Sequence, residues 1–232
     1  AGDEEAEHEL RAMQAEIRRD MEEGEGWENW YRHVGHDWNK VVLGNIQVQA
    51  YREHSGKSLG EVARATGKDP WDVFWDLVRG TAFALPESMT EANKMRAMRE
   101  EFVSFCTDVG PAGGSRISSH PRGYGSFPRI LSKYVRDHGV ISMEKAIAKM
   151  SAVAANQVLV HDRGRLAEGL AADIVIFNYD QITDRATFSE PHLPADGVRY
   201  VLVNGELVFE NGKFTGRRPG RVLRGPGFPA KP

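Results

Sequence analysis

The sequence predicts an α/β protein whose first two-thirds are mostly helical and whose last third is rich in β-strand. Up to about residue 163, apolar residues recur three or four positions apart among charged ones, with few β-branched runs between them. From about residue 164 onward, short apolar runs are instead separated by Asn-Gly pairs. The change in period indicates that the chain changes character near residue 164.

The helices of the first part are predicted from their apolar stripes and their capping residues. Residues 5–23 carry an apolar stripe among charges and end before Gly24. Ser58 and Glu61 form a capping box, and Asp69-Pro70 is a helix N-cap followed by proline at the first helical position. Further helices are expected at 91–99, at 127–137 and after Ser142.

The strands are predicted from β-branched and aromatic residues and from turn signals. Val41–Leu43 and Phe102–Cys106 are expected as strands, the second running into a Gly-, Pro- and Ser-rich loop at 110–126. The Asn204-Gly205 and Asn211-Gly212 pairs are strong hairpin signals. We therefore expect residues 173–177 and 198–214 to form one small antiparallel sheet, followed by a C-terminal tail along the surface.

Composition excludes several classes of partner. Thirty basic and 33 acidic residues leave a net charge of −3, which gives no electrostatic reason to bind nucleic acid or an anionic membrane. No apolar run approaches the roughly 18 residues that span a bilayer. A single cysteine excludes an intramolecular disulfide and fits a cytoplasmic location. The chain begins Ala-Gly-Asp, without an initiator methionine or a signal segment, which predicts a truncated or processed start.

Two short stretches contain candidate site residues. Asp108 follows an apolar run, as a carboxylate at the active-site end of a barrel strand would, although spacing alone favours a loop aspartate that caps its own turn. Cys106 would share its face by strand alternation, or be a small buried apolar residue. Arg122 offers a planar fork for a carboxylate, between His120 and Tyr124 in a glycine-containing segment, and the alternative is a solvated surface loop.

The remaining histidine and glycine patterns give weaker indications of a functional site. His33 and His36 could share a metal on one helical turn, but they flank Gly35 with no second pair nearby, so a polar surface loop is favoured. His192 is expected in a loop. The segment 111–114 lacks the Lys-Ser/Thr that a phosphate-binding loop requires.

Three stretches together resemble the N-acyl-D-amino-acid deacylase (D-aminoacylase) branch of the amidohydrolase superfamily. They are Phe105–Asp108, the run HPRGYGSFPRIL at 120–131, and the run DRGRLAEGLAADIV at 162–175. The second is specific to this branch, whereas the third is general to the superfamily. The resemblance covers nearly all of residues 1–230 and departs from the family pattern at Thr107 and Val109.

The resemblance implies the C-terminal portion of a (β/α)8 metal-dependent hydrolase barrel at residues 1–163, with a helical insert at about 55–100. Residues 164–232 would then be a β-rich segment of a small β-sandwich. It implies that a zinc-activated water hydrolyses N-acyl-D-amino acids, with Asp108 as metal-associated acid/base catalyst. Arg122, His120 and Tyr124 are candidates for binding the substrate. The other zinc ligands of the family, an early His-x-His, a Cys and two histidines, have no match in this chain.

Two alternatives remain open from the sequence. The chain could be a non-catalytic or split-gene fragment that needs an N-terminal half, because most of the zinc ligands are missing. It could also act on another amide or a cyclic amide, because a fold does not determine a substrate.

Overall fold

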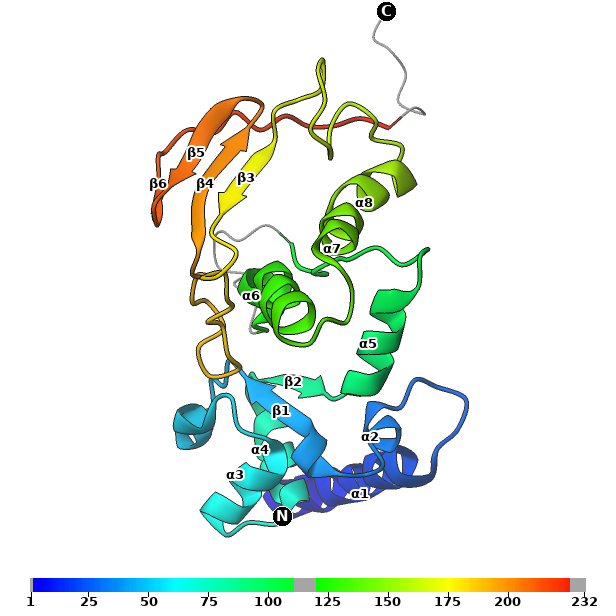
Figure 1. Cartoon of the computed structure of the whole chain (residues 1–232). Helices are drawn as coiled ribbons and strands as arrows, with labels where there is room; N and C mark the ends of the chain where they lie inside the picture. Colours follow the sequence, from blue (N-terminus) through cyan, green and yellow to red (C-terminus); the bar gives the residue numbers. More distant parts are fainter. Residues whose placement is uncertain (1, 111–119, 226–232) are drawn as a thin grey trace, which may run out of the picture. The chain divides into compact units, whose positions relative to one another are not determined.

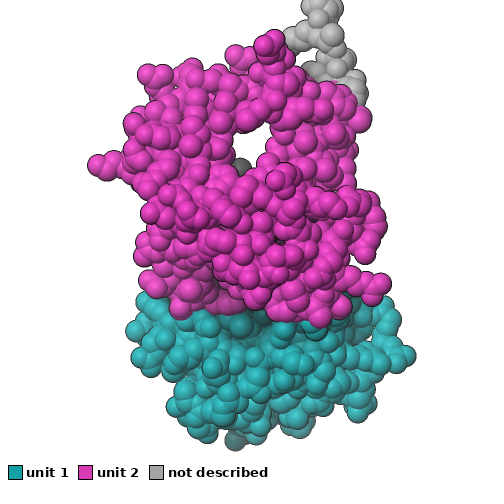
Figure 2. All heavy atoms as spheres, viewed as in Figure 1, with its two compact units in different colours: residues 1–90 teal, residues 91–232 magenta. Residues whose placement is uncertain are grey.

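The computed structural model describes residues 2–110 and 120–225 (Figure 1). The chain divides into two compact units, unit 1 at residues 1–90 and unit 2 at residues 91–232 (Figure 2). The boundary predicted near residue 164 lies inside unit 2, so the proposed division into two domains remains a prediction.

Unit 1 is mostly helical, with one antiparallel strand pair. In chain order it contains α1 (Gly2–Glu23), α2 (Trp30–His33), η1 (Trp38–Lys40), β1 (Val41–Gly44), η2 (Gln49–His54), α3 (Leu59–Thr66), α4 (Pro70–Arg79) and β2 (Phe83–Pro86). β1 pairs with β2 in antiparallel register. The predicted helix at 5–23 and the strand at 41–43 are confirmed.

The capping residues of unit 1 act as predicted. The Ser58 hydroxyl accepts the Glu61 N–H at 3.2 Å, and the Glu61 carboxylate accepts the Ser58 N–H at 2.7 Å. The Asp69 carboxylate accepts the Trp71 N–H at 2.9 Å at the start of α4. These bonds satisfy N–H groups of a first helical turn that have no partner within the helix, which explains why α3 and α4 begin where they do.

An aromatic cluster fills the core of unit 1. Tyr31 and Trp38 stack with ring centroids 4.2 Å apart, and Trp71 meets them edge-on at 5.3 and 5.2 Å. The Arg18 guanidinium lies 5.0 Å from the centroid of a Trp71 ring. Val62 and Val73 are fully buried beside this cluster. The apolar faces of α3 and α4 are therefore packed into this core, whereas Leu10, Met13 and Ile17 of the stripe on α1 are exposed.

Unit 2 consists of helices followed by a four-stranded sheet. The elements are α5 (Glu91–Arg99), α6 (Arg122–Arg129), the π-helix η3 (Ile130–Asp137), α7 (Met143–Met150), α8 (Ala152–Gln157), β3 (Ile174–Phe177), β4 (Val198–Val203), β5 (Glu206–Glu210) and β6 (Lys213–Phe214). The helices predicted at 91–99 and after Ser142 are confirmed. The helix predicted at 127–137 begins earlier and continues as a π-helix past Pro128, whose ring nitrogen cannot donate a helical hydrogen bond.

The sheet of unit 2 confirms the prediction for residues 173–177 and 198–214. Its strand order is β3-β4-β5-β6, and all pairs are antiparallel. At the first turn Asn204 and Gly205 have φ values of 47° and 81°, and Asn211 and Gly212 have 45° and 87° at the second. Asparagine and glycine are the residues that adopt positive φ most readily, so the two turns determine the register.

Two predictions for the segment before α6 are wrong. Residues 102–106 do not form a strand: the Phe105 N–H donates to the Lys149 carbonyl at 3.1 Å, while the Lys149 ammonium donates to the carbonyls of Glu100 and Val103. The segment is thus held by α7 and not by a neighbouring strand. The loop predicted at 110–126 ends at Pro121, because residues 122–126 are helical; residues 111–119, including the glycines at 113 and 114, lie outside the described residues.

Among the described residues, no helix combines the length and the hydropathy that crossing a lipid bilayer requires.

Candidate functional site

Asp108 lies in a tight turn and not at the end of a strand. Its φ is 50°, in the left-handed region that few residues other than glycine adopt and that aspartate tolerates. Its N–H donates to the Cys106 sulfur at 3.2 Å, and its side chain is 85% exposed. Cys106 therefore does border Asp108, through this turn and not through strand alternation. Cys106 is exposed, so the alternative of a small buried residue is wrong.

Arg122 joins this turn to the first turn of α6. Its Nη2 donates to the Asp108 carbonyl oxygen at 2.8 Å and lies 3.0 Å from Oδ2 of the same residue. The structure thus brings together two of the predicted site residues. The Arg122 side chain is 42% exposed, so the pair is accessible to a solute from water. A carboxylate anion from solution would compete with Asp108 for the guanidinium.

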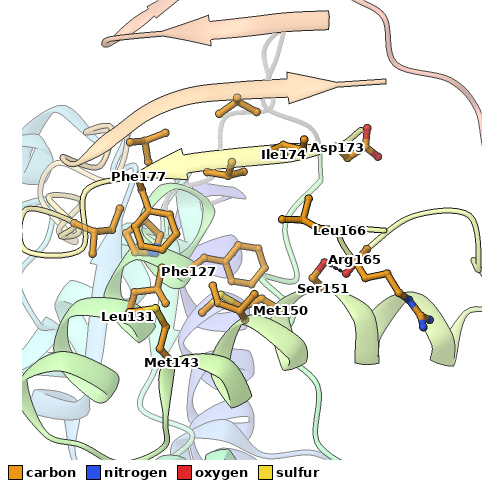
Figure 3. Close-up of a pocket in the computed structure, with 17 residues that line it drawn as sticks. Phe127, Leu131, Met143, Met150, Ser151, Arg165, Leu166, Asp173, Ile174 and Phe177 are labelled. Carbon is orange, nitrogen blue, oxygen red and sulfur yellow. Dashed lines mark hydrogen bonds between the residues drawn. The ribbon is translucent and has the colours of Figure 1, made fainter. Parts of the chain in front are cut away.

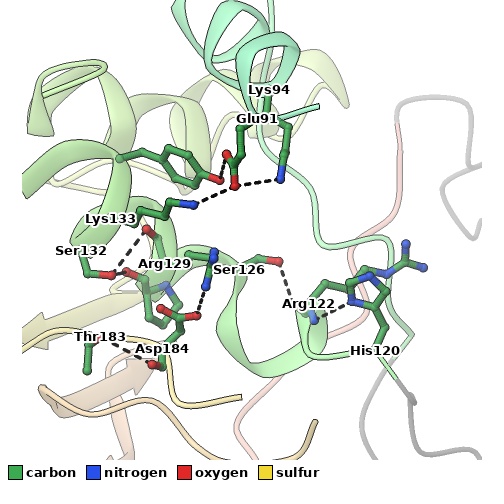
Figure 4. A network of polar contacts seen from close by, with 12 residues as sticks. Glu91, Lys94, His120, Arg122, Ser126, Arg129, Ser132, Lys133, Thr183 and Asp184 are labelled. Atoms are coloured by element: carbon green, nitrogen blue, oxygen red, sulfur yellow. Dashed lines mark hydrogen bonds and ion pairs between the residues drawn. The ribbon is translucent and has the colours of Figure 1, made fainter. Parts of the chain in front are cut away.

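His120 caps the helix that carries Arg122. Its Nδ1 accepts the Arg122 N–H at 3.0 Å (Figure 4). The first N–H groups of a helix have no acceptor within the helix, and the imidazole supplies one here. An accepting Nδ1 carries no proton, so the proton of the neutral ring is on Nε2. Burial, and then the charge of Arg122, lower the pKa of the His120 imidazole, which favours this neutral form.

The connection between β3 and β4 adds two aromatic contacts that the sequence did not indicate. The Phe188 ring meets His120 edge-on with centroids 5.2 Å apart. His192 meets the Tyr124 ring at 5.8 Å. His192 does lie in a loop, as predicted, but its position against Tyr124 has no signal in the sequence because the two residues are far apart along the chain.

Polar contacts also hold the later residues of α6 and the π-helix η3 (Figure 4). Arg129 donates to the Asp184 carboxylate at 2.8 Å. The Glu91 carboxylate accepts from Lys133 at 2.7 Å and from the Tyr134 hydroxyl at 2.8 Å. The bond from Lys133 lowers the pKa of Glu91 to about 2, with a smaller contribution from Tyr134 and against a partial burial that raises it. These contacts place the helix that positions Arg122.

The described residues contain no group of three or more His, Cys, Asp or Glu side chains arranged to hold a metal ion. His33 and His36 do not form a pair: the His33 Nε2 lies 3.1 Å from the Ser88 carbonyl oxygen, while the His36 ring packs against Tyr31 at 5.0 Å. His33 is the last residue of α2 and His36 lies just after it in a turn, so the predicted polar loop is found for His36 and not for His33. Asp108, the predicted metal-associated residue, contacts Arg122 and Cys106.

Unit 2 also contains an apolar cavity of about 720 Å³ between its sheet and its helices (Figure 3). Phe127 and Leu131 line it from the helical side, and Val175 and Phe177 from the sheet. Ser151, Arg165 and Asp173 are its polar lining residues. None of the four predicted site residues borders this cavity, which is suited to apolar groups and not to a charged substrate.

A family model for amidohydrolases matches residues 55–209, well over half of the chain. The chain belongs to the amidohydrolase family. Its α/β fold is of the amidohydrolase type and is similar to solved D-aminoacylase structures: one such structure superposes with a TM-score of 0.63 at 33% identity, over 76% of this chain and 36% of that one. N-acyl-D-glutamate deacylase from Bordetella bronchiseptica, solved with zinc and a phosphonate mimic of the tetrahedral intermediate, gives 0.67 at 33% identity over 82% and 38%.

The chain is also similar in sequence to part of two longer deacylases. N-acyl-D-glutamate deacylase from Alcaligenes xylosoxydans xylosoxydans is 40% identical over 175 residues, which are 74% of this chain and 34% of that protein. D-aminoacylase from the same organism is 36% identical over 173 residues, 75% of this chain and 35% of that protein. The chain therefore spans about a third of the length of the curated relatives it matches.

Proposed function

We propose that this chain is the C-terminal part of a zinc-dependent amidohydrolase that hydrolyses N-acyl-D-amino acids to a D-amino acid and a carboxylate. The observation that carries the proposal is the contact between Arg122 and Asp108, which puts a carboxylate-binding group beside a potential acid/base group. The deacylase activity of relatives at 33–40% identity supports it.

The proposal extends to the architecture of the complete enzyme. Residues 1–163 would contribute the last part of a (β/α)8 barrel, with the helical insert at about 55–100, and residues 164–232 would contribute to a small β-sandwich. The antiparallel sheet β3-β4-β5-β6 supports the second assignment, because antiparallel sheets commonly pack one face against another layer.

A zinc site does not fit the described residues by themselves. Catalytic zinc normally has three protein ligands, and the described residues offer no such group. We propose that the other ligands come from an N-terminal part corresponding to the roughly two-thirds of the relatives that this chain does not span.

The residues of this chain would have separate roles in amide hydrolysis. The Asp108 carboxylate takes a proton from the attacking water and returns it to the departing amino nitrogen. Arg122 binds the α-carboxylate of the substrate through two parallel hydrogen bonds. His120 donates through its Nε2–H to a substrate oxygen, and Tyr124 lies beside it.

Fusion to the N-terminal part of a relative tests the proposal. The chain is joined to the segment of the Alcaligenes N-acyl-D-glutamate deacylase that has no counterpart in it, and release of D-amino acid from N-acetyl-D-glutamate and N-acetyl-D-methionine is measured. We expect the fusion to retain zinc after dialysis and to turn over. Asp108→Asn should lower kcat by about 100-fold or more at unchanged zinc content. Asp180→Asn, a change to another exposed carboxylate, is the matched control.

The isolated chain should neither retain zinc after dialysis nor hydrolyse either substrate. A tightly held equivalent of zinc in the isolated chain would contradict the proposal and return His33, His36 and Cys106 to consideration as ligands. A fusion that holds zinc but stays inactive would favour the non-catalytic alternative. Near-parental kcat in Asp108→Asn would remove Asp108 from the mechanism.

A further inference from the structure

The connection between β3 and β4 forms a closed loop at residues 183–196, called the 183–196 loop below. Thr183 and Asp196 exchange backbone hydrogen bonds of 3.4 and 3.0 Å at its base. Gly197 follows with a φ of 86°, and a Cβ there would lie 2.6 Å from the Ile182 backbone. The ends of the loop are thus held together, as in compact surface loops with a defined conformation.

The loop is attached to α6 at two levels. Near its start, the Asp184 side chain is 13% exposed and bonded to Arg129. One helical turn closer to the start of α6, a Cβ at Gly125 would lie 3.2 Å from the Asp184 Cβ and 3.6 Å from the Ala186 Cβ. Gly125 therefore lets the loop backbone approach the helix more closely than most residues would allow.

Beyond these anchors the loop turns over the first turn of α6. Thr187 and Glu190 form a turn, with the Glu190 N–H donating to the Thr187 hydroxyl at 2.9 Å and the Thr187 N–H to the Glu190 carbonyl at 3.1 Å. This turn carries Phe188, and His192 follows it. Their rings reach His120 and Tyr124 respectively.

We propose that the 183–196 loop forms a wall of the candidate active site, in which Phe188 and His192 are positioning residues for His120 and Tyr124. Phe188 restricts rotation of the His120 ring and so keeps Nδ1 on the Arg122 N–H and directs the Nε2–H donor. The loop thereby affects which D-amino-acid side chain the site admits. This inference rests on the proposed function for its consequence in catalysis, but the positioning itself is a property of this chain.

Hydrogen exchange of the Arg122 amide in the isolated chain, followed by NMR, tests the positioning. Phe188→Ala should accelerate this exchange by about tenfold, because the imidazole no longer stays on the N–H. Phe188→Tyr, which keeps the ring edge, should restore protection. Phe214→Ala is the matched control, because Phe214 makes a similar edge-on contact of 5.3 Å with Phe209 elsewhere in unit 2. Equal exchange in Phe188→Ala and Phe214→Ala would overturn the inference.

Two further measurements keep the test decisive. If Phe188→Ala fails to fold, Phe188→Leu replaces it, with unchanged exchange of the other α6 amides as the criterion for an intact helix. In the fusion enzyme, Phe188→Ala and His192→Ala should raise KM several-fold, by different factors for N-acetyl-D-glutamate and N-acetyl-D-methionine, and leave kcat within about twofold. An equal change in KM for both substrates would contradict the proposal that the 183–196 loop forms a wall of the site. An inactive parental fusion would instead contradict the proposed function and leave the exchange result standing.

Discussion

The two units differ in how tightly their apolar cores are packed. In unit 1, Val62 and Val73 are fully buried and Leu59 is 1% exposed, so α3, α4 and the aromatic cluster form a well-packed core. In unit 2, Val175, Ile176 and Leu166 are 56%, 48% and 81% exposed, and a cavity of about 720 Å³ lies between the sheet and the helices. Both units have a buried core and some exposed apolar residues, Leu10, Met13 and Ile17 in unit 1 among them, but the cavity of this size lies in unit 2.

The packed core of unit 1 and the polar candidate site of unit 2 should respond differently to substitution. Unit 1 gains its free energy of folding from apolar burial, so its core positions should be sensitive to truncation. The candidate site of unit 2 consists of half-exposed polar groups held by hydrogen bonds, so its residues should affect binding more than folding. All five tryptophans lie in unit 1, so tryptophan fluorescence reports the unfolding of that unit alone.

The largest effect is expected in the aromatic cluster. Trp71→Ala removes the ring that meets Tyr31 and Trp38, and should lower the free energy of unfolding of unit 1 by about 3–5 kcal/mol. Urea unfolding followed by the fluorescence of the remaining tryptophans measures this. Trp27→Ala is the control, because Trp27 is 52% exposed and its loss should cost no more than about 0.5 kcal/mol. Similar losses for the two variants would show that the core of unit 1 is not packed as described.

A substitution at the candidate site should alter substrate binding and leave the stability of the chain unchanged. Arg122→Lys keeps the charge but loses the planar fork, so in the fusion enzyme KM for substrates with a free carboxylate should rise by about tenfold with little change in kcat. The unfolding of the isolated chain should stay the same, since the side chain is 42% exposed. A fall in stability without a change in KM would assign Arg122 to the fold and not to the site.

A pH-dependent effect is expected at the start of unit 2. Glu91 has a pKa of about 2 in the folded chain against an ordinary value of 4.5. A depressed folded-state pKa stabilises the fold above the unfolded-state value, and this contribution is lost as the pH falls from about 4.5 to about 2. The Glu91 side chain is 46% exposed, so solvent screening reduces the contribution to about 1 kcal/mol.

Circular dichroism of urea unfolding between pH 2 and 6 measures the contribution of Glu91. The parent should lose stability across this range, and Glu91→Gln should start lower at pH 6 and decline less. Curves that stay parallel for the two proteins would show that the contacts of Glu91 with Lys133 and Tyr134 do not stabilise unit 2.

The smallest effect is expected at Val175, a partly exposed sheet residue that lines the cavity of unit 2. Val175→Thr should change stability by less than about 0.5 kcal/mol, because Val175 is 56% exposed and threonine suits a strand. The same substitution at the buried Val73 introduces a hydroxyl into the core and should cost about 1–3 kcal/mol. This matched pair compares the two units directly. A large loss at Val175 would show that the sheet face of unit 2 is as well packed as the core of unit 1.

The sequence predicts well those elements whose start or turn depends on residues close together in the chain. The capping box at Ser58, the N-cap at Asp69 and the Asn-Gly turns each use residues within a few positions of one another, so the sequence contains the whole interaction. The segment at 102–106 was predicted as a strand because its residue types favour one. A strand also needs a partner, and here the Lys149 carbonyl and ammonium occupy the nearby backbone groups instead.

By itself, the sequence determined the order of helices and turns, the small antiparallel sheet and the family, because short-range patterns and motif identity are both local. The tertiary structure decided which side chains meet. The fold brings Arg122 onto Asp108, Phe188 onto His120 and His192 onto Tyr124. Contacts between residues distant along the chain depend on how whole elements pack, and residue type and spacing do not encode that packing one position at a time.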